Sequence, residues 1–133
     1  MRRVFAGTFF FLALLNRRDP AHQTALESYG SGEYRFVTTE WVLAEVADAT
    51  TAPDMRPGFQ RLFEVLENDE KVKIIPACHE LFHRGMRLYF DRPDKNWSLT
   101  DCVSFTVMSD EGLTDALTGD HHFEQAGFVA LLV

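Results

Sequence analysis

Three acidic residues of this chain, Glu45, Asp101 and Asp120, stand where an α/β protein would enter or begin a helix. The matching position after the first predicted strand holds Gly7. Hard divalent cations such as Mg²⁺ prefer several oxygen ligands. Acids at such positions can converge and hold the cation that a metal-dependent nuclease uses. The sequence therefore predicts a divalent-metal site that lacks one carboxylate.

Each acid also has a simpler structural explanation. Ser98 and Asp101 match a capping box, so Asp101 can serve only the start of a helix. Asp120 can be the N-cap of a helix that begins at His121. Glu45 can be a solvated helix residue. The metal hypothesis depends on whether the fold brings the three acids together.

A second metal motif is His79-Glu80-Leu81-Phe82-His83, which matches the H-E-x-x-H pattern of zinc proteases. At about 100° per residue, both histidines fall on the flank of the helix that faces water. No third zinc ligand follows at a zinc-protease spacing. We therefore expect an exposed helix here, and zinc protease remains the less favoured alternative.

A pair of histidines, His121 and His122, follows Asp120 directly. These side chains can ligate a metal or transfer protons. Neighbouring helix residues point about 100° apart, so at most one can face the site. We expect surface positions for both.

Composition indicates one soluble globular domain over residues 1–133, with 46% hydrophobic and 25% charged residues. Cys78 and Cys102 form no C-x-x-C pair, and we expect two buried thiols in a reducing, cytoplasmic protein. The net charge of −7 argues against broad non-specific binding to nucleic acid. It is compatible with a nucleic-acid enzyme whose acids surround a cation.

The N-terminus combines basic Arg2 and Arg3 with an apolar run from Val4 to Leu15. A membrane span needs ~20 apolar residues, so this run is too short. It is followed by charged residues and not by a small-residue cleavage site. We expect a buried strand that leads into a helix, and no membrane association.

The elements that would position the acids alternate between strand and helix. Predicted strands cover Arg3–Ala6, Arg35–Thr38, Lys71–Ile75, Ala116–Thr118 and Phe128–Leu132. Predicted helices cover Thr8–Leu15 with Thr8 as cap, Pro20–Tyr29, Trp41–Ala49, Pro57–Asn68, Ala77 to about Phe90, Leu99 to about Ser109, and the turn His121–Gln125. Such alternation predicts a three-layer α/β/α domain with a short parallel sheet of about five strands. Ligands of these sheets bind beyond the carboxyl ends of the strands, where Gly7 and Asp120 fall.

Four segments together resemble the PIN-domain family, and specifically the VapC-type toxins of bacterial toxin–antitoxin pairs. The segments are Val4–Pro20, Thr38–Val46 with Glu45, Trp97–Cys102 with Asp101, and Leu117–Phe123 with Asp120. They span nearly the whole chain in the family's order.

The resemblance implies an RNA-cleaving nuclease in which Glu45, Asp101 and Asp120 coordinate Mg²⁺ or Mn²⁺. It implies that the hydroxyls of Thr8 and Thr118 orient those ligands without binding the metal themselves. It also implies a small antitoxin (VapB-like) as partner, and a homodimer or a toxin–antitoxin hetero-oligomer. Apolar residues around Trp41 and along Phe59–Leu66 are candidate docking surface, with core packing as the alternative.

Gly7 departs from the family, which has an aspartate there. One hypothesis is that glycine eases a tight turn between strand and helix. We prefer the hypothesis that Gly7 replaces a functional aspartate, natively or by engineering, and impairs catalysis. The alternative function is a non-catalytic PIN-fold binding module that acts through its partner surface.

Overall fold

Five parallel strands form the centre of the computed structural model, which describes all 133 residues of the chain. Their order across the sheet is β3-β2-β1-β4-β5. The strands are β1 (Arg2–Ala6), β2 (Tyr34–Thr39), β3 (Val72–Ile75), β4 (Asp115–Leu117) and β5 (Val129–Ala130). The α/β class and the number of strands confirm the prediction from sequence.

The central strand β1 fixes the register of the sheet. Val4 pairs with Phe36 of β2, and Phe5 pairs with Ala116 of β4. Val4, Phe5 and Ala6 are fully buried, as expected for a parallel strand with helices on both faces. Because β1 and β4 are neighbours, the segments that follow Ala6 and Leu117 emerge side by side.

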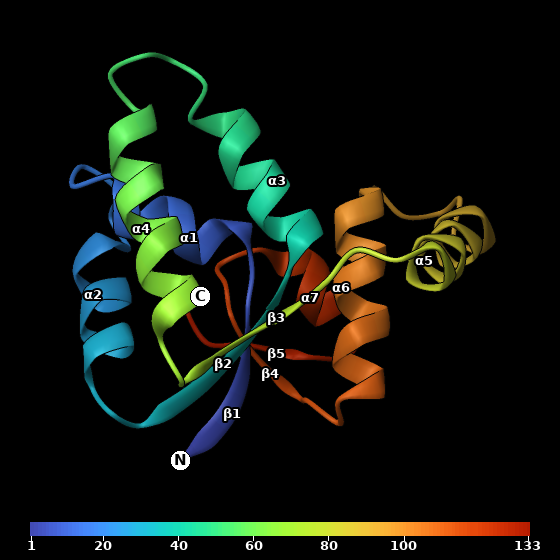
Figure 1. Cartoon of the computed structure of the whole chain (residues 1–133). Helices are drawn as coiled ribbons and strands as arrows, with labels where there is room; N and C mark the ends of the chain where they lie inside the picture. The colour runs from blue at the N-terminus through green and yellow to red at the C-terminus, as the bar shows by residue number, and fades with distance from the viewer.

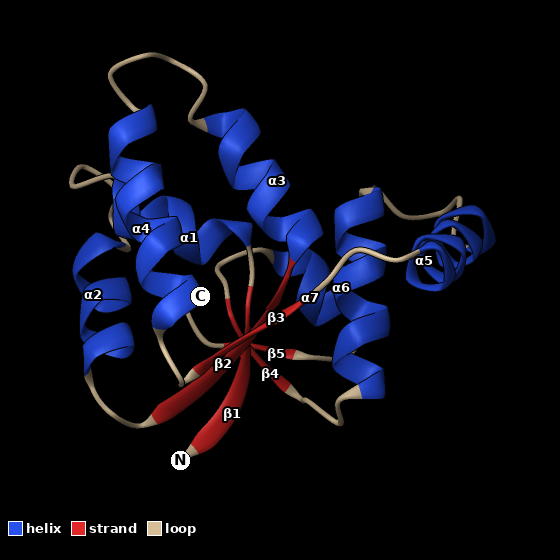
Figure 2. Ribbon diagram, in the orientation of Figure 1, coloured by secondary structure: helices blue, strands red, loops and turns tan.

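Seven helices complete the fold, and Figures 1 and 2 show most of them on the two faces of the sheet. They are α1 (Thr8–Leu15), α2 (His22–Gly30), α3 (Glu40–Ala49), α4 (Arg56–Asn68), α5 (His79–Asp91), α6 (Leu99–Asp110) and α7 (His121–Gln125). Helices α1, α2 and α4 lie on one face, and α6 and α7 on the other. Helix α5 packs on the outer side of α6 and not on the sheet.

Polar side chains start the helices that carry the acids. The hydroxyl of Thr39 accepts a hydrogen bond from Val42 N and so begins α3. Ser98 and Asp101 form the predicted capping box of α6. The sequence prediction that Thr8 caps the first helix is wrong. Gly7 occupies the cap position, and Thr8 is already the first helical residue.

One expectation about burial is also wrong. Cys102 is buried as expected, but Cys78 is exposed because it precedes α5 and lies outside its packed face. In α4, Leu66 makes the fully buried contact, and Val65 is half exposed.

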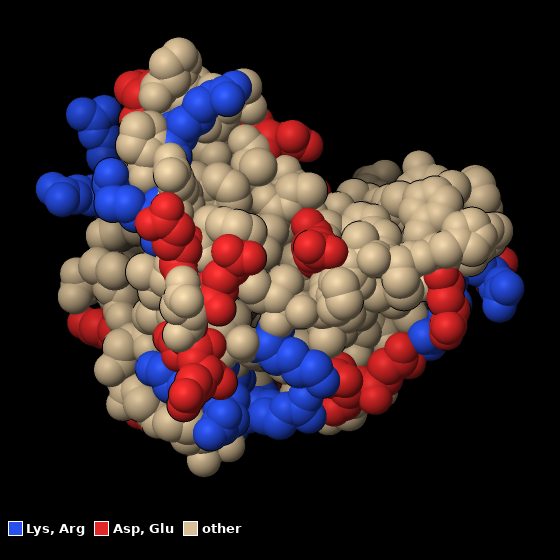
Figure 3. Space-filling view, in the orientation of Figure 1, with Lys and Arg blue, Asp and Glu red and all other residues tan.

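The surface shows no single dominant charge on the face in Figure 3, where acidic and basic side chains are interspersed. Arg3 and Lys73, for example, share Glu111 as their ion-pair partner. None of the helices is both long and apolar enough to cross a lipid bilayer.

Candidate metal centre

A small recess lies where the carboxyl ends of β1 and β4 meet helices α3 and α6. Its volume is about 30 Å³, enough for an ordered water molecule or an ion. All six residues singled out from the sequence line it, namely Gly7, Thr8, Glu45, Asp101, Thr118 and Asp120. Phe9, Val42, Thr100, Ser104 and Phe123 complete the lining. The fold thus brings together residues that span more than 100 positions of the chain.

The backbone of Gly7 does not require glycine. Its φ of −98° and ψ of 179° are extended values that any residue adopts. A Cβ built on Gly7 would lie 3.6 Å from Cζ of Phe123, at ordinary van der Waals distance. The hypothesis that glycine is needed for a tight turn is therefore wrong. The recess has room for a Cβ atom at this position.

Asp101 is the most confined of the acids, with its side chain only 14% exposed. Its Oδ2 accepts a hydrogen bond from Ser98 N at 3.0 Å and lies 3.2 Å from Nδ1 of His122. Burial and the negative charge of Asp120 raise the pKa of this carboxyl, and the contacts with Ser98 N and His122 offset part of that effect. A bound cation would offset both the cost of burying the Asp101 charge and its repulsion by Asp120.

Asp120 serves both the helix start and the recess. Its Oδ1 accepts a hydrogen bond from His122 N at 2.9 Å, which caps α7. The hydroxyl of Thr118 accepts a hydrogen bond from Asp120 N at 3.1 Å and so orients this residue. The Asp120 side chain therefore caps α7 and also lines the recess with the other acids.

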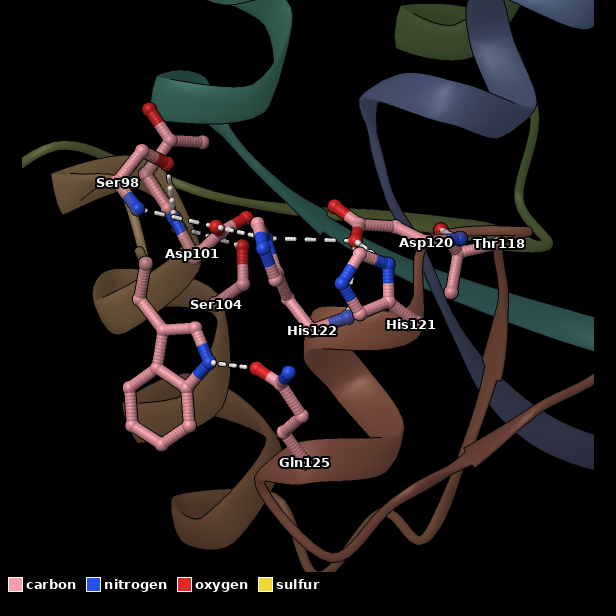
Figure 4. Close-up of polar contacts among 10 residues, drawn as sticks. Ser98, Asp101, Ser104, Thr118, Asp120, His121, His122 and Gln125 are labelled. Atoms are coloured by element: carbon pink, nitrogen blue, oxygen red, sulfur yellow. Dashed lines mark hydrogen bonds and ion pairs between the residues drawn. The ribbon is translucent and has the colours of Figure 1, made fainter. Parts of the chain in front are cut away.

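His122 was expected at the surface, and this expectation is wrong. Its Nδ1 lies 3.2 Å from Asp101 Oδ2 and 3.4 Å from Asp120 Oδ1, so its ring faces both carboxylates (Figure 4). His121 is 69% exposed and approaches only Asp120, at 3.9 Å. The N-cap bond from His122 N to Asp120 places the backbone of His122 beside the acids, but no sequence signal showed which way its ring turns.

The remaining members of the recess suit a cation or an ordered water. Glu45 is half-buried on α3 and lines the recess. Oγ1 of Thr8 is the one buried side-chain oxygen or nitrogen without a hydrogen-bond partner in the protein. Such groups are normally satisfied by water or an ion. The donor set is thus rich in oxygen and fits a divalent metal.

The H-E-x-x-H segment shows no comparable cluster. His79 and His83 meet edge to face on the exposed side of α5, with ring centroids 4.4 Å apart. The group of metal-ligating side chains that the structure does bring together is Asp120, His121 and His122. This arrangement agrees with the expected exposed helix.

A larger groove opens on the other side of α6 and α7. It has a volume of about 460 Å³ and is lined by the basic residues Arg84, Arg87 and Arg92. Trp97 forms part of its wall, held by a 3.0 Å hydrogen bond from Nε1 to Oε1 of Gln125. The guanidinium of Arg92 lies over the Trp97 ring, 5.0 Å from its centroid.

Comparisons with known proteins agree with this geometry. A family model described as "PIN domain" matches residues 7–129. The chain is 27% identical over 128 residues to the 23S rRNA-specific endonuclease VapC20 of Mycobacterium tuberculosis, with 95% of each chain covered.

Solved structures show the same fold. The crystal structure of VapC20, titled a Sarcin-Ricin loop cleaving toxin, superposes with a TM-score of 0.86 at 24% identity, covering 96% of this chain and 98% of that one. VapBC2 from Rickettsia felis, bound to a promoter DNA fragment, gives a TM-score of 0.67 at 14% identity, covering 96% of each chain. FitAcB from Neisseria gonorrhoeae gives 0.62 at 16%, covering 96% of this chain and 94% of that one.

Proposed function

The chain belongs to the PIN-domain family, and from this premise we propose that it is a VapC-type ribonuclease toxin whose catalysis is impaired at Gly7. The observation that carries the proposal is the recess itself. Glu45, Asp101 and Asp120 come from three different helix starts or helices, and all three line it beside Gly7. A purely structural role for each acid gives no reason for this convergence.

In the proposed mechanism, Glu45, Asp101 and Asp120 hold Mg²⁺ or Mn²⁺. A divalent cation in such a site activates a water for attack on a phosphodiester and stabilises the charge that develops on the phosphate. The hydroxyl of Thr118 holds the backbone of Asp120, and Thr8 offers an unused hydroxyl beside the acids. Gly7 contributes no ligand, so we expect weaker metal binding and slower cleavage than an aspartate would give.

RNA is the proposed substrate. Support comes from the relative named a 23S rRNA-specific endonuclease and from the groove that Arg84, Arg87 and Arg92 line. Arginine side chains bind phosphate oxygens through paired N–H groups. The groove and the recess lie on different sides of α6 and α7, so an RNA chain that reaches the acids from the groove must pass around these helices.

The proposed partner is a small antitoxin of the VapB type. Structural neighbours include a VapBC2 structure, and α4 offers a partly apolar outer surface. Val65 is 50% exposed there, whereas Trp41, Phe59 and Phe63 are only partly exposed and pack against the core. We propose that the antitoxin binds this surface in the cytoplasm and thereby inhibits the nuclease. The complex is then a toxin–antitoxin hetero-oligomer, and the chain without antitoxin is a homodimer.

Gly7 favours one alternative function specifically. A PIN fold without its first aspartate can act as a non-catalytic module that binds its partner or RNA without turnover. This alternative keeps the groove and the α4 surface and gives the acids no role in cleavage.

Two substitutions at one position separate these functions. Gly7→Asp restores a carboxylate, and Gly7→Asn adds a side chain of the same shape without charge. We expect Gly7→Asp to cleave RNA at least tenfold faster than the starting protein in Mn²⁺, and Gly7→Asn to remain at the starting rate. Equal rates in all three proteins, with Mn²⁺ bound, would support the non-catalytic module instead.

A further inference from the structure

We propose that the groove beside Trp97 is a binding site for one unpaired nucleotide of the RNA, separate from the recess that the acids line. The inference deepens the proposed function and rests on RNA being the substrate. Arg92 provides the surface on which the base stacks, and Arg87 binds the phosphate. Gln125 and Ser109 contact the edge of the base.

The first support is the size of the cavities. The recess has a volume of about 30 Å³, which admits a water molecule or an ion but no base. The groove has a volume of about 460 Å³, and sites for small organic molecules span about 300–1,000 Å³. Two other cavities of similar size, between α3 and α4 and between α1 and α2, are lined by one arginine and by none. Contacts with a base must therefore form outside the recess, and the groove has both the room and the arginines.

The second support is charge. The chain carries a net charge of −7, yet the groove is lined by three arginines and a single acid, Asp91. Arg84 is paired with Asp110, and Arg92 with Asp94. Arg87 is exposed and has no such partner, so its N–H groups are open to a phosphate. The groove is thus a basic site on an acidic protein, and it suits an anionic ligand.

The third support is a stacking surface. The guanidinium of Arg92 lies 5.0 Å from the centroid of the Trp97 ring. The Arg92 side chain is 40% exposed, whereas Trp97 is only 6% exposed, so a ligand in the groove meets the guanidinium first. Unpaired bases stack on arginine guanidinium planes as they do on aromatic rings. We therefore assign the stacking surface to Arg92, with Trp97 beneath it.

This surface is held in place before any ligand binds. Asp94 accepts two hydrogen bonds from Arg92, at 3.0 and 3.1 Å. Trp97 donates a 3.0 Å hydrogen bond to Gln125 (Figure 4) and meets the ring of Phe105 edge to face, with centroids 5.0 Å apart. Side chains that are already ordered lose little conformational freedom on binding. The arrangement therefore favours binding of a flat ligand.

The rim of the groove offers polar groups to the edge of a base. The indole nitrogen of Trp97 can only donate, so it fixes Oε1 of Gln125 as its acceptor and leaves the amide nitrogen of Gln125 to donate elsewhere. The hydroxyl of Ser109, exposed at the same groove, can donate or accept. Base edges are accessible to such groups in loops and bulges, where the bases are unpaired and unstacked. The ligand class is therefore an unpaired nucleotide.

The first test follows the fluorescence of Trp97 in a Trp41→Phe protein, where it is the only tryptophan left. The probes are AMP, adenosine and ribose 5-phosphate, in EDTA so that the acids hold no metal. We expect AMP to bind at least fivefold more tightly than either of the other two, because only AMP has both base and phosphate. Equal affinity for AMP and ribose 5-phosphate would overturn the proposal, since the groove would then bind phosphate alone.

Two variants with a matched control locate the contacts. Arg92→Lys keeps the charge and removes the planar surface, so it should lose at least fivefold in AMP affinity and less than twofold for ribose 5-phosphate. Arg2→Lys is the control, since Arg2 also lies over a ring, 5.7 Å from the centroid of Tyr34, and pairs with Asp115 away from the groove. It should change neither affinity more than twofold. Arg87→Gln should weaken AMP and ribose 5-phosphate at least threefold and leave adenosine unchanged.

Circular dichroism of each variant controls for folding. Equal losses of AMP affinity in Arg92→Lys and Arg2→Lys would overturn the stacking role of Arg92. Quenching of Trp97 by an acidic peptide and not by AMP would also overturn the proposal, in favour of a protein partner in the groove.

The last test uses RNA without divalent metal. A hairpin with an unpaired loop should bind at least fivefold more tightly than a blunt duplex of equal length, by fluorescence anisotropy, and Arg92→Lys should remove the difference. Equal binding of the two RNAs would overturn the proposal. A chain that binds AMP in the groove but cuts no RNA even as Gly7→Asp would overturn the ribonuclease function and leave the nucleotide site standing. RNA cleavage by Gly7→Asp without AMP binding would do the reverse.

Discussion

A Cβ atom on residue 7 would lie 3.6 Å from Cζ and 3.9 Å from Cε1 of Phe123. Gly7 thus faces an aromatic ring across a gap that a Cβ atom can occupy without moving the ring. It is also the N-cap of α1, and no side chain accepts a hydrogen bond from the first turn. Glycine at this position therefore lowers stability in two ways. It gives the unfolded chain more conformational entropy, and it leaves the helix without a side-chain cap, although the backbone conformation does not require glycine.

Gly7→Asn should stabilise the protein. An extended φ loses nothing by the change, and removing glycine from a compatible position gains about 0.4–1 kcal/mol. The asparagine oxygen can accept from an N–H group in the first turn of α1, which adds a few tenths of a kcal/mol. Chemical denaturation at neutral pH measures the difference. A loss of stability would show that the recess cannot hold the side chain.

Gly7→Asp should be less stable than Gly7→Asn when metal is removed, because a further carboxylate then faces Asp101 and Asp120. Metal reverses the order, since a ligand at 100 times its dissociation constant stabilises the folded state by about 2.7 kcal/mol. Melting temperatures with EDTA and with Mn²⁺ give the comparison. The same ranking under both conditions would contradict a carboxylate cluster at this point.

Asp101→Asn should raise the melting temperature at neutral pH. The folded protein raises the pKa of Asp101, mainly by burial and next by the charge of Asp120. A raised carboxyl pKa means that the folded state binds the proton more tightly, so stability is lost as pH rises through that pKa. The substitution removes this loss. Its benefit should be greatest near neutral pH and should vanish below about pH 4, where the unfolded carboxyl is also protonated.

Asp110→Asn is the control of opposite sign. Arg84 donates two hydrogen bonds to Asp110, at 2.6 and 2.7 Å, and the pKa of that carboxyl is lowered. The ion pair of Asp110 with Arg84 therefore stabilises the folded state above the ordinary pKa of Asp, and this stabilisation is lost as pH falls through the lowered pKa. The substitution should therefore cost stability at neutral pH, by about 0–1 kcal/mol for so exposed a pair. If the change in melting temperature followed pH in the same direction for Asp101→Asn and Asp110→Asn, the opposite pKa shifts of the two carboxyls would be contradicted.

The fold could be predicted from sequence because its signals are local. Val4 to Ala6 begins an apolar run too short for a membrane span, which favours a buried strand, and Ser98 with Asp101 marks a helix start in four residues. The last strand is Val129–Ala130 rather than Phe128–Leu132. Its end depends on pairing with the short β4, which no local pattern encodes.

The acids of the site could be predicted because each follows a strand or opens a helix at the same edge of the sheet. The position of His122 could not, because periodicity fixes only the angle between His121 and His122 and not which of them faces Asp101. The groove was missed for a related reason. Arg84, Arg87 and Arg92 come from α5 and the loop after it, and the packing of α5 on α6 alone brings them to Trp97.

Gly85→Ala should destabilise the protein, since Gly85 is where α5 packs most closely on α6. A Cβ on Gly85 would lie 2.5 Å from Cγ2 and 3.5 Å from Cα of Val103. Overpacking of this kind costs about 1–3 kcal/mol, more than the gain of about 1 kcal/mol in helix propensity. Denaturant unfolding measures it.

Gly58→Ala in α4 is the matched helical control. Its added Cβ would meet only Leu15 Cδ2 at 3.9 Å and Arg61 at 4.0 Å. Without a clash, helix propensity should dominate and stabilise the protein by up to about 1 kcal/mol. Because α6 carries Asp101, the Gly85 variant should also weaken metal binding, and the Gly58 variant should not.

Arg87→Gln tests the groove as an RNA surface. Arg84 is paired with Asp110, and Arg92 with Asp94. Arg87 has no ion-pair partner, so its charge is free for phosphate. Each phosphate contact with single-stranded nucleic acid contributes about 0.7 to the slope of log affinity against log salt. Removing Arg87 should therefore weaken RNA binding and lower that slope by about 0.7, measured by fluorescence anisotropy without divalent metal.

Arg35→Gln is the control for this loss of charge. Arg35 is exposed on β2 near the amino end of the sheet, makes no ion pair, and lies away from the groove lining. It changes the net charge by the same single unit, so any effect of overall charge on RNA binding appears in both variants. A groove that follows the RNA backbone requires the Arg87 variant to lose more affinity and more salt dependence than the Arg35 variant. Equal losses would mean that net charge alone governs binding, and the recess would then need another path for its substrate.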